Sequence, residues 1–260
     1  VSRLYPDLRG SLGGALLALY GMSSMVSAPV FAWLNGQLGW RLSLAMLFGV
    51  YVAVGWVAWA LLPVASAQKG HQTVRLPLAV LLRHQTLRWA VVIVLIATPL
   101  GSASFAAIGH LASGLGFSPA FGVLAVSLMA LGNGLGRLGF GMLADWRSPR
   151  FSRNAVLSLN ALAATLLLCV LHGVGVWAFA AYPLLIGLAF GGMAGKLPAL
   201  AAHVVEDGHA ESAFGLLFGA FALASFLGPA ASAVVGMHLS LLVFALSALT
   251  AAAVALAVVS

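Results

Sequence analysis

Long apolar stretches separated by short polar ones set the pattern of the chain. Each stretch has close to, or more than, the ~20 residues with which a helix crosses the hydrocarbon core of a bilayer. Most of them lack the polar face of a surface helix in a soluble domain, and the ~10-residue alternating segments of a membrane barrel do not occur. The pattern predicts an all-α membrane protein with eight spanning helices. The stretches are 11–35, 42–63, 89–112, 119–143, 154–172, 176–205, 212–234 and 239–259.

Composition supports this assignment. Of the 260 residues, 62% are hydrophobic and 7% are charged, whereas soluble domains carry about 25% charged residues. The net charge of +7 does not indicate a nucleic-acid partner, because the basic residues lie mostly in the polar linkers. A single cysteine, Cys169, and the lack of hydrolase and phosphate-loop motifs predict neither an enzyme nor a metal or cofactor site.

The linkers predict the orientation of the helices. Nine of the ten basic residues outside the apolar stretches lie in the segments 1–10, 64–88 and 144–153, and only Arg41 lies in a linker of the other set. If all eight stretches cross, the three basic segments share one side of the membrane. Because linkers rich in lysine and arginine stay in the cytoplasm, both termini are predicted to be cytoplasmic, in an inner membrane.

One polar linker carries a recognisable motif. The segment Gly141-Met-Leu-Ala-Asp145-Trp-Arg147-Ser-Pro-Arg150 resembles the Gly-x-Leu-Ala-Asp-x-x-x-x-Arg signature of the major facilitator superfamily. The signature lies between the second and third helix of each six-helix half of these transporters. The resemblance implies that Gly141, Asp145, Arg147 and Arg150 stabilise the outward-facing state through charge contacts between helices, and do not bind substrate. The positions of Trp146, Ser148 and Pro149 depart from the fuller pattern.

The resemblance extends to the start of the chain and implies a division into parts. Tyr5-Pro-Asp-Leu-Arg-Gly10 and Gly39-Trp-Arg41 are similar to the loops before the fifth and sixth helices of the superfamily. Residues 1–63 would then be the last two helices of the N-terminal half. Residues 64–88 would be the cytoplasmic central linker, and 89–260 the C-terminal half. The eight spans would correspond to helices five to twelve of a twelve-helix transporter, without the first four; the alternative is a genuine eight-span protein.

Two cations are predicted to lie deep in the membrane. Arg137 precedes Asp145 by eight residues and Lys196 precedes Glu206 by ten, which puts them ~12 Å and ~15 Å from the polar ends of their helices. An ionisable residue at that depth is by default a functional hypothesis. All five acidic residues fall in linkers or at helix ends. Two buried cations without a buried acid therefore predict an anionic ligand, such as an organic carboxylate.

The surroundings of Arg137 favour a binding site. Asn133 and Gly134 precede it by one turn on the same face, and Ala130 extends that face, so small side chains are expected to leave room beside the guanidinium group. The pattern Asn133-Gly-Leu-Gly-Arg137 resembles the monocarboxylate and oxalate:formate branch, in which an arginine at this position binds the substrate carboxylate. Two departures remain. Asn133 replaces the acidic residue of proton-coupled carriers, and the segment 215–221 lacks the lysine of oxalate exchangers.

Glycines and prolines within the apolar stretches predict how the helices pack and where they bend. Four-residue spacing of glycines predicts close helix packing, and five prolines inside the stretches permit kinks. The glycines are Gly187, Gly191 and Gly195, with the pairs Gly132/Gly136 and Gly215/Gly219. The prolines are Pro29, Pro99, Pro183, Pro198 and Pro229.

The sequence thus predicts a secondary transporter that works by alternating access, monomeric when full length, in contact with the lipid bilayer. Its substrate is predicted to be a small organic anion held by Arg137, Asn133 and Lys196. One alternative is an exporter of drugs or other hydrophobic compounds, in which Arg137 is structural and Lys196 snorkels to the interface. Another is a transport-dead truncated membrane protein.

Overall fold

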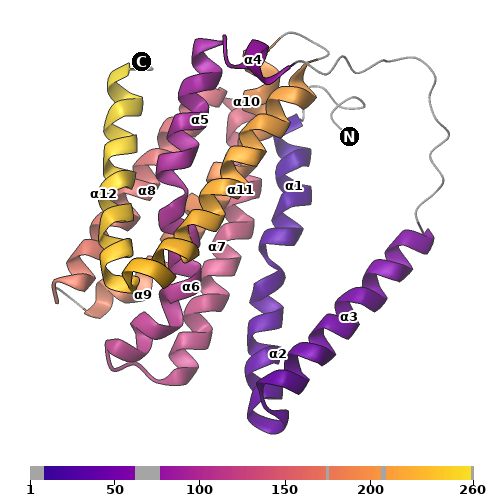
Figure 1. Cartoon of the computed structure of the whole chain (residues 1–260), viewed down its shortest axis with the longest axis vertical. Helices are drawn as coiled ribbons and strands as arrows, with labels where there is room; N and C mark the ends of the chain where they lie inside the picture. The colour runs from indigo at the N-terminus through magenta and orange to yellow at the C-terminus, as the bar shows by residue number, and fades with distance from the viewer. Residues whose placement is uncertain (1–8, 62–76, 174–175, 206–208, 259–260) are drawn as a thin grey trace.

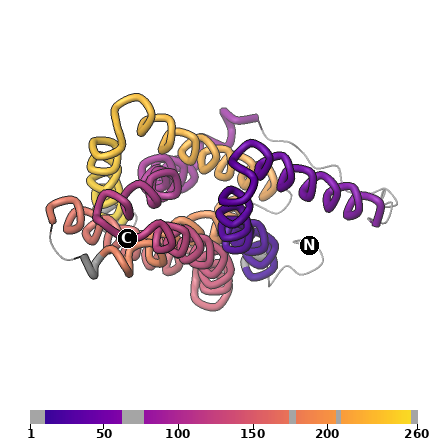
Figure 2. Tube along the Cα trace, turned by 90° about the horizontal axis from the view of Figure 1, so that it is seen from below, coloured from indigo at the N-terminus to yellow at the C-terminus, as the bar shows by residue number. Residues whose placement is uncertain are grey.

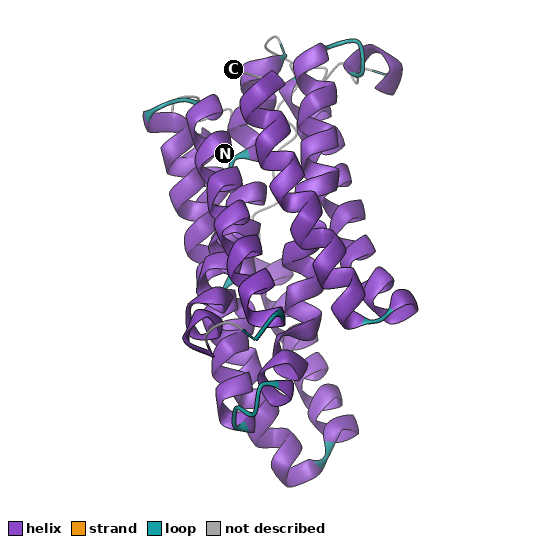
Figure 3. Ribbon diagram, turned by 90° about the vertical axis from the view of Figure 1, so that its left-hand side faces the viewer, coloured by secondary structure: helices purple, strands orange, loops and turns teal. Residues whose placement is uncertain are grey.

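The described residues of the computed structural model, 9–61, 77–173, 176–205 and 209–258, form helices joined by short loops and contain no strand (Figure 3). Eight segments are long and apolar enough to cross a membrane, which confirms the predicted all-α architecture. The helices are α1 (Arg9–Gly21), α2 (Ser23–Leu38), α3 (Trp40–Leu61), α4 (Leu78–Leu81), α5 (Gln85–Ala97), α6 (Pro99–Gly114), α7 (Pro119–Trp146), α8 (Pro149–Leu171), α9 (Val176–Gly195), α10 (Leu197–Val204), α11 (Ala210–Val235) and α12 (Met237–Val258).

Three of the eight spans are broken within the membrane-spanning length. α1 passes into α2 at Met22, α5 into α6 at Thr98, and α9 into α10 at Lys196. Pro99 and Pro198 explain two of these breaks, because a proline removes a backbone N–H and its ring clashes with the preceding turn. The other three prolines remain inside α2, α9 and α11. The break at Met22 has no proline beside it.

Helices α5 to α12 form a bundle, with α1 and α2 along one side of it (Figures 1 and 2). Two apolar clusters of buried side chains make up the core of this bundle. α1 and α2 both pack against α7. α3 packs against α2 but leans away from the bundle, and Ser43 is its single buried residue. The chain therefore has a well-packed part and a loosely attached one.

The linkers alternate between the two ends of the bundle. The start of α1, the α7–α8 connection and the end of α12 lie at one end, and the α2–α3 and α11–α12 connections lie at the other (Figure 1). This is the arrangement that eight crossings require; which end faces the cytoplasm stays a prediction. The polar segment 144–153 is mostly helical, since α7 continues to Trp146 and α8 begins at Pro149. Arg153, expected in a loop, is only 6% exposed within α8.

A seam of glycines joins α7 to α9. Any Cβ atom added to one of these glycines would lie less than 3 Å from the backbone of the other helix, so the two backbones are in direct contact. The predicted packing is confirmed for Gly132, Gly136, Gly187, Gly191 and Gly195. The prediction was wrong for Gly215 and Gly219, because no atom of another helix in the described part of the chain lies within 4 Å of a Cβ built at either. These two glycines occupy an open face of α11.

Candidate functional site

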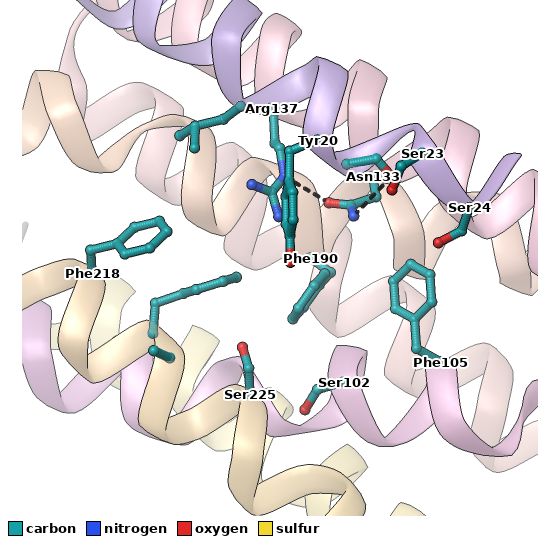
Figure 4. A pocket seen from close by; sticks show the side chains of 14 residues that line it. Tyr20, Ser23, Ser24, Ser102, Phe105, Asn133, Arg137, Phe190, Phe218 and Ser225 are labelled. Carbon is teal, nitrogen blue, oxygen red and sulfur yellow. Dashed lines mark hydrogen bonds between the residues drawn. The ribbon is translucent and has the colours of Figure 1, made fainter. Parts of the chain in front are cut away.

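A cavity of about 700 Å³ lies between α1–α2 on one side and α6, α7, α9 and α11 on the other (Figure 4). Among the described residues that line it, Arg137 is the only charged one. Its lining is otherwise rich in phenyl rings and hydroxyl groups. The lining residues are Leu17, Tyr20, Gly21, Ser23, Ser24, Ser102, Phe105, Asn133, Arg137, Phe190, Phe218, Phe221, Ala222 and Ser225.

Arg137 sits in the wall of this cavity on α7. It is 2% exposed, and its Nε donates a hydrogen bond to Asn133 Oδ1 over 3.0 Å. The ring of Tyr20 lies against the guanidinium, with Cζ 5.3 Å from the ring centroid, which is a cation–π distance. Within the described part of the chain, Arg137 Nη1 has no hydrogen-bond partner. Burying a cation with an unpaired N–H donor costs free energy. An acceptor that binds Nη1 would therefore be stabilising.

Asn133 fixes the position of the arginine by bridging two helices. Its Oδ1 accepts from Arg137, and its Nδ2 donates to the carbonyl oxygen of Gly21 over 3.3 Å. The Gly21 carbonyl lies at the α1/α2 break, where the N–H of Met25 bonds to the Met22 carbonyl, three residues back. The Gly21 carbonyl, which the N–H of Met25 would bond in a regular α-helix, can therefore accept from the side-chain amide of Asn133. The structure thus brings the two predicted residues of α7 together and adds α1 to the site.

Two glycines lie at close approaches within this contact. A Cβ on Gly21 would lie 3.0 Å from Arg137 Nε and 3.2 Å from Asn133 Cγ. A Cβ on Gly134 would fall within bonding distance of Met22 Cγ, so Met22 fills the space beside Gly134. The expectation that Gly134 leaves room for a ligand was therefore wrong. Gly134 instead allows α1 to approach α7 closely.

The aromatic and hydroxyl lining could not be predicted from local spacing. Phe105, Phe190, Phe221 and Phe218 form a chain of ring contacts with centroid separations of 5.6, 5.2 and 5.9 Å. They come from three different helices, and the serines come from α2, α6 and α11. Ser225 Oγ is buried and has no hydrogen-bond partner among the described residues. Only the tertiary fold places these groups around Arg137.

Lys196 lies outside the lining of this cavity. It occupies the α9/α10 break, is 2% exposed, and its Nζ lies 3.5 Å from the sulfur of Met193. The preceding Gly195 packs on the backbone of Arg137, so the two cations are at similar depth, as expected. Arg153 is within electrostatic reach of Lys196. A role for Lys196 in binding an anion stays a prediction.

The loop motif connects α7 to the start of α1. Asp145 Oδ2 accepts hydrogen bonds from the backbone N–H and the hydroxyl of Ser11, over 2.6 and 2.7 Å. The N–H of Ser11 is one of the first in α1, and a carboxylate is favourable at that end of a helix. Gly141 is buried, whereas Arg147 and Arg150 are exposed. The guanidinium of Arg147 lies 6.0 Å from the ring centroid of Phe151. Asp145 thus makes a contact between helices, while the effect of the motif on the outward-facing state stays a prediction.

No cluster of three or more histidine, cysteine, aspartate or glutamate side chains that could hold a metal ion occurs within the described ranges. The sequence model of the Major Facilitator Superfamily matches residues 1–229. No curated protein matches the chain. The family match covers the two helices α1 and α2, the cavity and the loop motif.

Proposed function

The chain belongs to the Major Facilitator Superfamily, and from this premise we propose that it carries a small organic anion across a membrane by alternating access. Members of this superfamily are membrane transporters for small molecules. One observation carries the choice of an anion. Arg137, nearly completely buried, is the single charged residue in the lining of the cavity and keeps Nη1 without a partner in the described structure.

The energetics favour an anion over a neutral or cationic substrate. An arginine near the centre of a bilayer costs ~2.5–3.5 kcal/mol or more. An entering carboxylate offsets this cost through charge-assisted hydrogen bonds worth ~1.5–3 kcal/mol, which correspond to roughly 10- to 150-fold in affinity. A cation entering the same cavity would be repelled. Arginine is also the cation whose planar group matches a carboxylate with two parallel hydrogen bonds.

The remaining parts take their roles from this assignment. We assign residues 1–63 to the end of one six-helix half, 64–88 to the cytoplasmic linker, and 89–260 to the other half. Asn133 holds the arginine in position, and Lys196 supplies a second positive charge at the same depth. Asp145, with Gly141, Arg147 and Arg150, stabilises the outward-facing state through contacts between helices. The distribution of basic residues supports a cytoplasmic position for both termini.

The test is anion uptake by the full-length protein in proteoliposomes, before and after substitution of Arg137. Arg137→Gln is expected to abolish uptake of labelled carboxylates, because it removes the positive charge. Arg137→Lys is expected to reduce uptake by more than tenfold, because lysine keeps the charge but loses the bidentate geometry. The matched control is Arg41→Gln, since Arg41 is exposed and outside the cavity lining. Wild-type uptake by a well-inserted Arg137→Gln variant would contradict the proposal.

A second function is favoured by the four phenylalanines of the lining. Aromatic side chains bind hydrophobic compounds with little demand on charge, so export of such compounds is the alternative. In that case Arg137→Gln would leave transport of lipophilic cations unchanged or raise it. Parallel uptake measurements with a labelled carboxylate and a lipophilic cation distinguish the two functions.

A further inference from the structure

The wall around Arg137 is aromatic and only sparsely aliphatic. Four phenylalanines and Tyr20 line the cavity, against Leu17 and Ala222 as the aliphatic members. Figure 4 shows Phe190, Phe105 and Phe218 spread around the space beside Arg137 and Tyr20. The ring centroids of three neighbouring phenylalanine pairs are 5.2–5.9 Å apart, within the range that favours ring–ring contacts.

We infer that the anion is an aromatic monocarboxylate, which rests on the proposed function of the same site. Its carboxylate would bind the guanidinium of Arg137, and its ring would lie among the phenylalanines. Two observations support this assignment, one for the carboxylate of the ligand and one for its ring. The first is a buried, partly unpartnered cation, and the second is a continuous aromatic wall beside it.

The charge of the lining sets the charge of the ligand. One cation and no acidic residue are found among the described lining residues. A monoanion neutralises Arg137 and leaves no net charge in a site of low dielectric constant. A dianion would bring a second negative charge for which the described lining holds no cation, since Lys196 lies outside that lining, and an unpaired charge there is costly. A neutral aromatic compound would leave the positive charge of Arg137 unpaired. Both are therefore poorer ligands than a monocarboxylate.

The size and hydroxyl content of the cavity agree with a ring. A volume of about 700 Å³ lies in the range of sites for ring-sized and larger ligands, and an acid of two or three carbons would fill a small part of it. Ser102 and Ser225 face the cavity from α6 and α11 (Figure 4). Ser225 Oγ lacks a partner within the described chain, so it is free to bond a polar substituent on the ring.

Competition experiments test the ring separately from the charge. Uptake of radiolabelled benzoate by the full-length protein in proteoliposomes is measured against six unlabelled competitors, of which benzoate itself is one. Cyclohexanecarboxylate has the same charge and similar size without aromaticity, acetate lacks the ring, benzyl alcohol lacks the charge, and phthalate is a dianion. Phenylacetate serves as a second aromatic monocarboxylate. Benzoate and phenylacetate are expected to compete at least threefold more strongly than cyclohexanecarboxylate, and far more strongly than the other three.

Variants of the aromatic wall sharpen the result. Phe105→Leu and Phe218→Leu each keep an apolar side chain and remove a ring that is only half-buried. Each is expected to weaken benzoate roughly 2- to 12-fold and to leave cyclohexanecarboxylate within twofold. The matched control is Phe121→Leu, because Phe121 stacks on Phe117 at a centroid distance of 4.3 Å and does not line the cavity. This variant is expected to behave as wild type towards both acids.

The outcomes separate this inference from the function on which it rests. Uptake that depends on Arg137 but treats benzoate, cyclohexanecarboxylate and acetate alike would overturn the aromatic assignment and leave an anion carrier. Benzoate uptake that is insensitive to Arg137→Gln would overturn both. Because inhibition by each acid is expressed as a fraction of the same variant's benzoate uptake, a lower amount of folded protein reduces the total uptake and cannot imitate selectivity.

Discussion

Two broken spans in this protein use the same device with different consequences. At the α1/α2 break, Asn133 of α7 donates from its amide to the carbonyl of Gly21 over 3.3 Å. At the α5/α6 break, Asn160 of α8 donates to the carbonyl of Ala97 over 3.0 Å. In an unbroken helix, the N–H four residues later would bond each of these carbonyls. Here the N–H of Met25 bonds the Met22 carbonyl instead, and the N–H of Gly101 bonds the Thr98 carbonyl. A neighbouring helix thus satisfies the buried carbonyl that each break releases, as the bilayer interior requires.

The difference between the breaks lies in what else each asparagine does. Asn160 is 2% exposed inside the α5–α12 bundle, and its break is encoded locally by Pro99. Asn133 lies beside the cavity, and its second amide atom accepts from Arg137. The same hydrogen bond is therefore structural at one break and couples the fold to the candidate binding site at the other. Substitutions at the two positions are therefore expected to separate stability from binding.

The largest effect is expected for Asn133→Leu. This change removes the bond to the Gly21 carbonyl and leaves Arg137 Nε without its acceptor, Asn133 Oδ1. Each unsatisfied buried group costs ~1–3 kcal/mol, and the arginine loses its fixed orientation. Carboxylate affinity is expected to fall more than tenfold, together with a lower melting temperature in detergent. Unchanged affinity in a destabilised variant would show that Asn133 has the same purely structural role as Asn160.

Asn160→Leu is expected to affect stability alone. The Ala97 carbonyl would lose its amide donor, which costs ~1–3 kcal/mol of the free energy of unfolding, whereas Arg137 and its partners remain intact. Thermal unfolding in detergent measures the first effect, and benzoate competition measures the second, with affinity expected within twofold of wild type. Ser158→Leu is the matched control, because Ser158 is exposed on the same helix. A tenfold loss of affinity in Asn160→Leu would erase the distinction between the breaks.

The sequence predicts the parts of this structure that depend on local pattern. The eight spans follow from hydropathy, the Asn133–Arg137 contact from four-residue spacing on one helix, and the α7–α9 seam from repeated glycines. What it does not predict depends on tertiary neighbours. No local rule places Tyr20 on Arg137 or gathers phenylalanines from α6, α9 and α11. Likewise, no local rule leaves the Gly215/Gly219 face open.

The breaks illustrate the same limit. Pro99 and Pro198 mark two of them in the sequence, because proline lacks the N–H that would continue the helix. Three further prolines, in α2, α9 and α11, have the same local chemistry and remain within helices. The break at Met22 has no proline, and only Gly21 and the serines Ser23 and Ser24 beside it mark the position in the sequence. The Gly21 carbonyl at this break is bonded by Asn133 of α7. The break therefore depends on a contact between residues 112 positions apart in the sequence.

The smallest effect is expected for Pro99→Ala. This change gives position 99 at the α5/α6 break a backbone N–H, as at the α1/α2 break, which contains no proline. The new N–H can bond the Leu95 carbonyl and straighten the span, which would draw Ala97 away from Asn160. We expect the free energy of unfolding to change by less than ~1 kcal/mol, since one hydrogen bond is gained as another weakens. A double-mutant cycle with Asn160→Leu should give a coupling of at least ~0.5 kcal/mol. Strict additivity would mean that Asn160 does not depend on the proline, and that the two breaks arise in the same way.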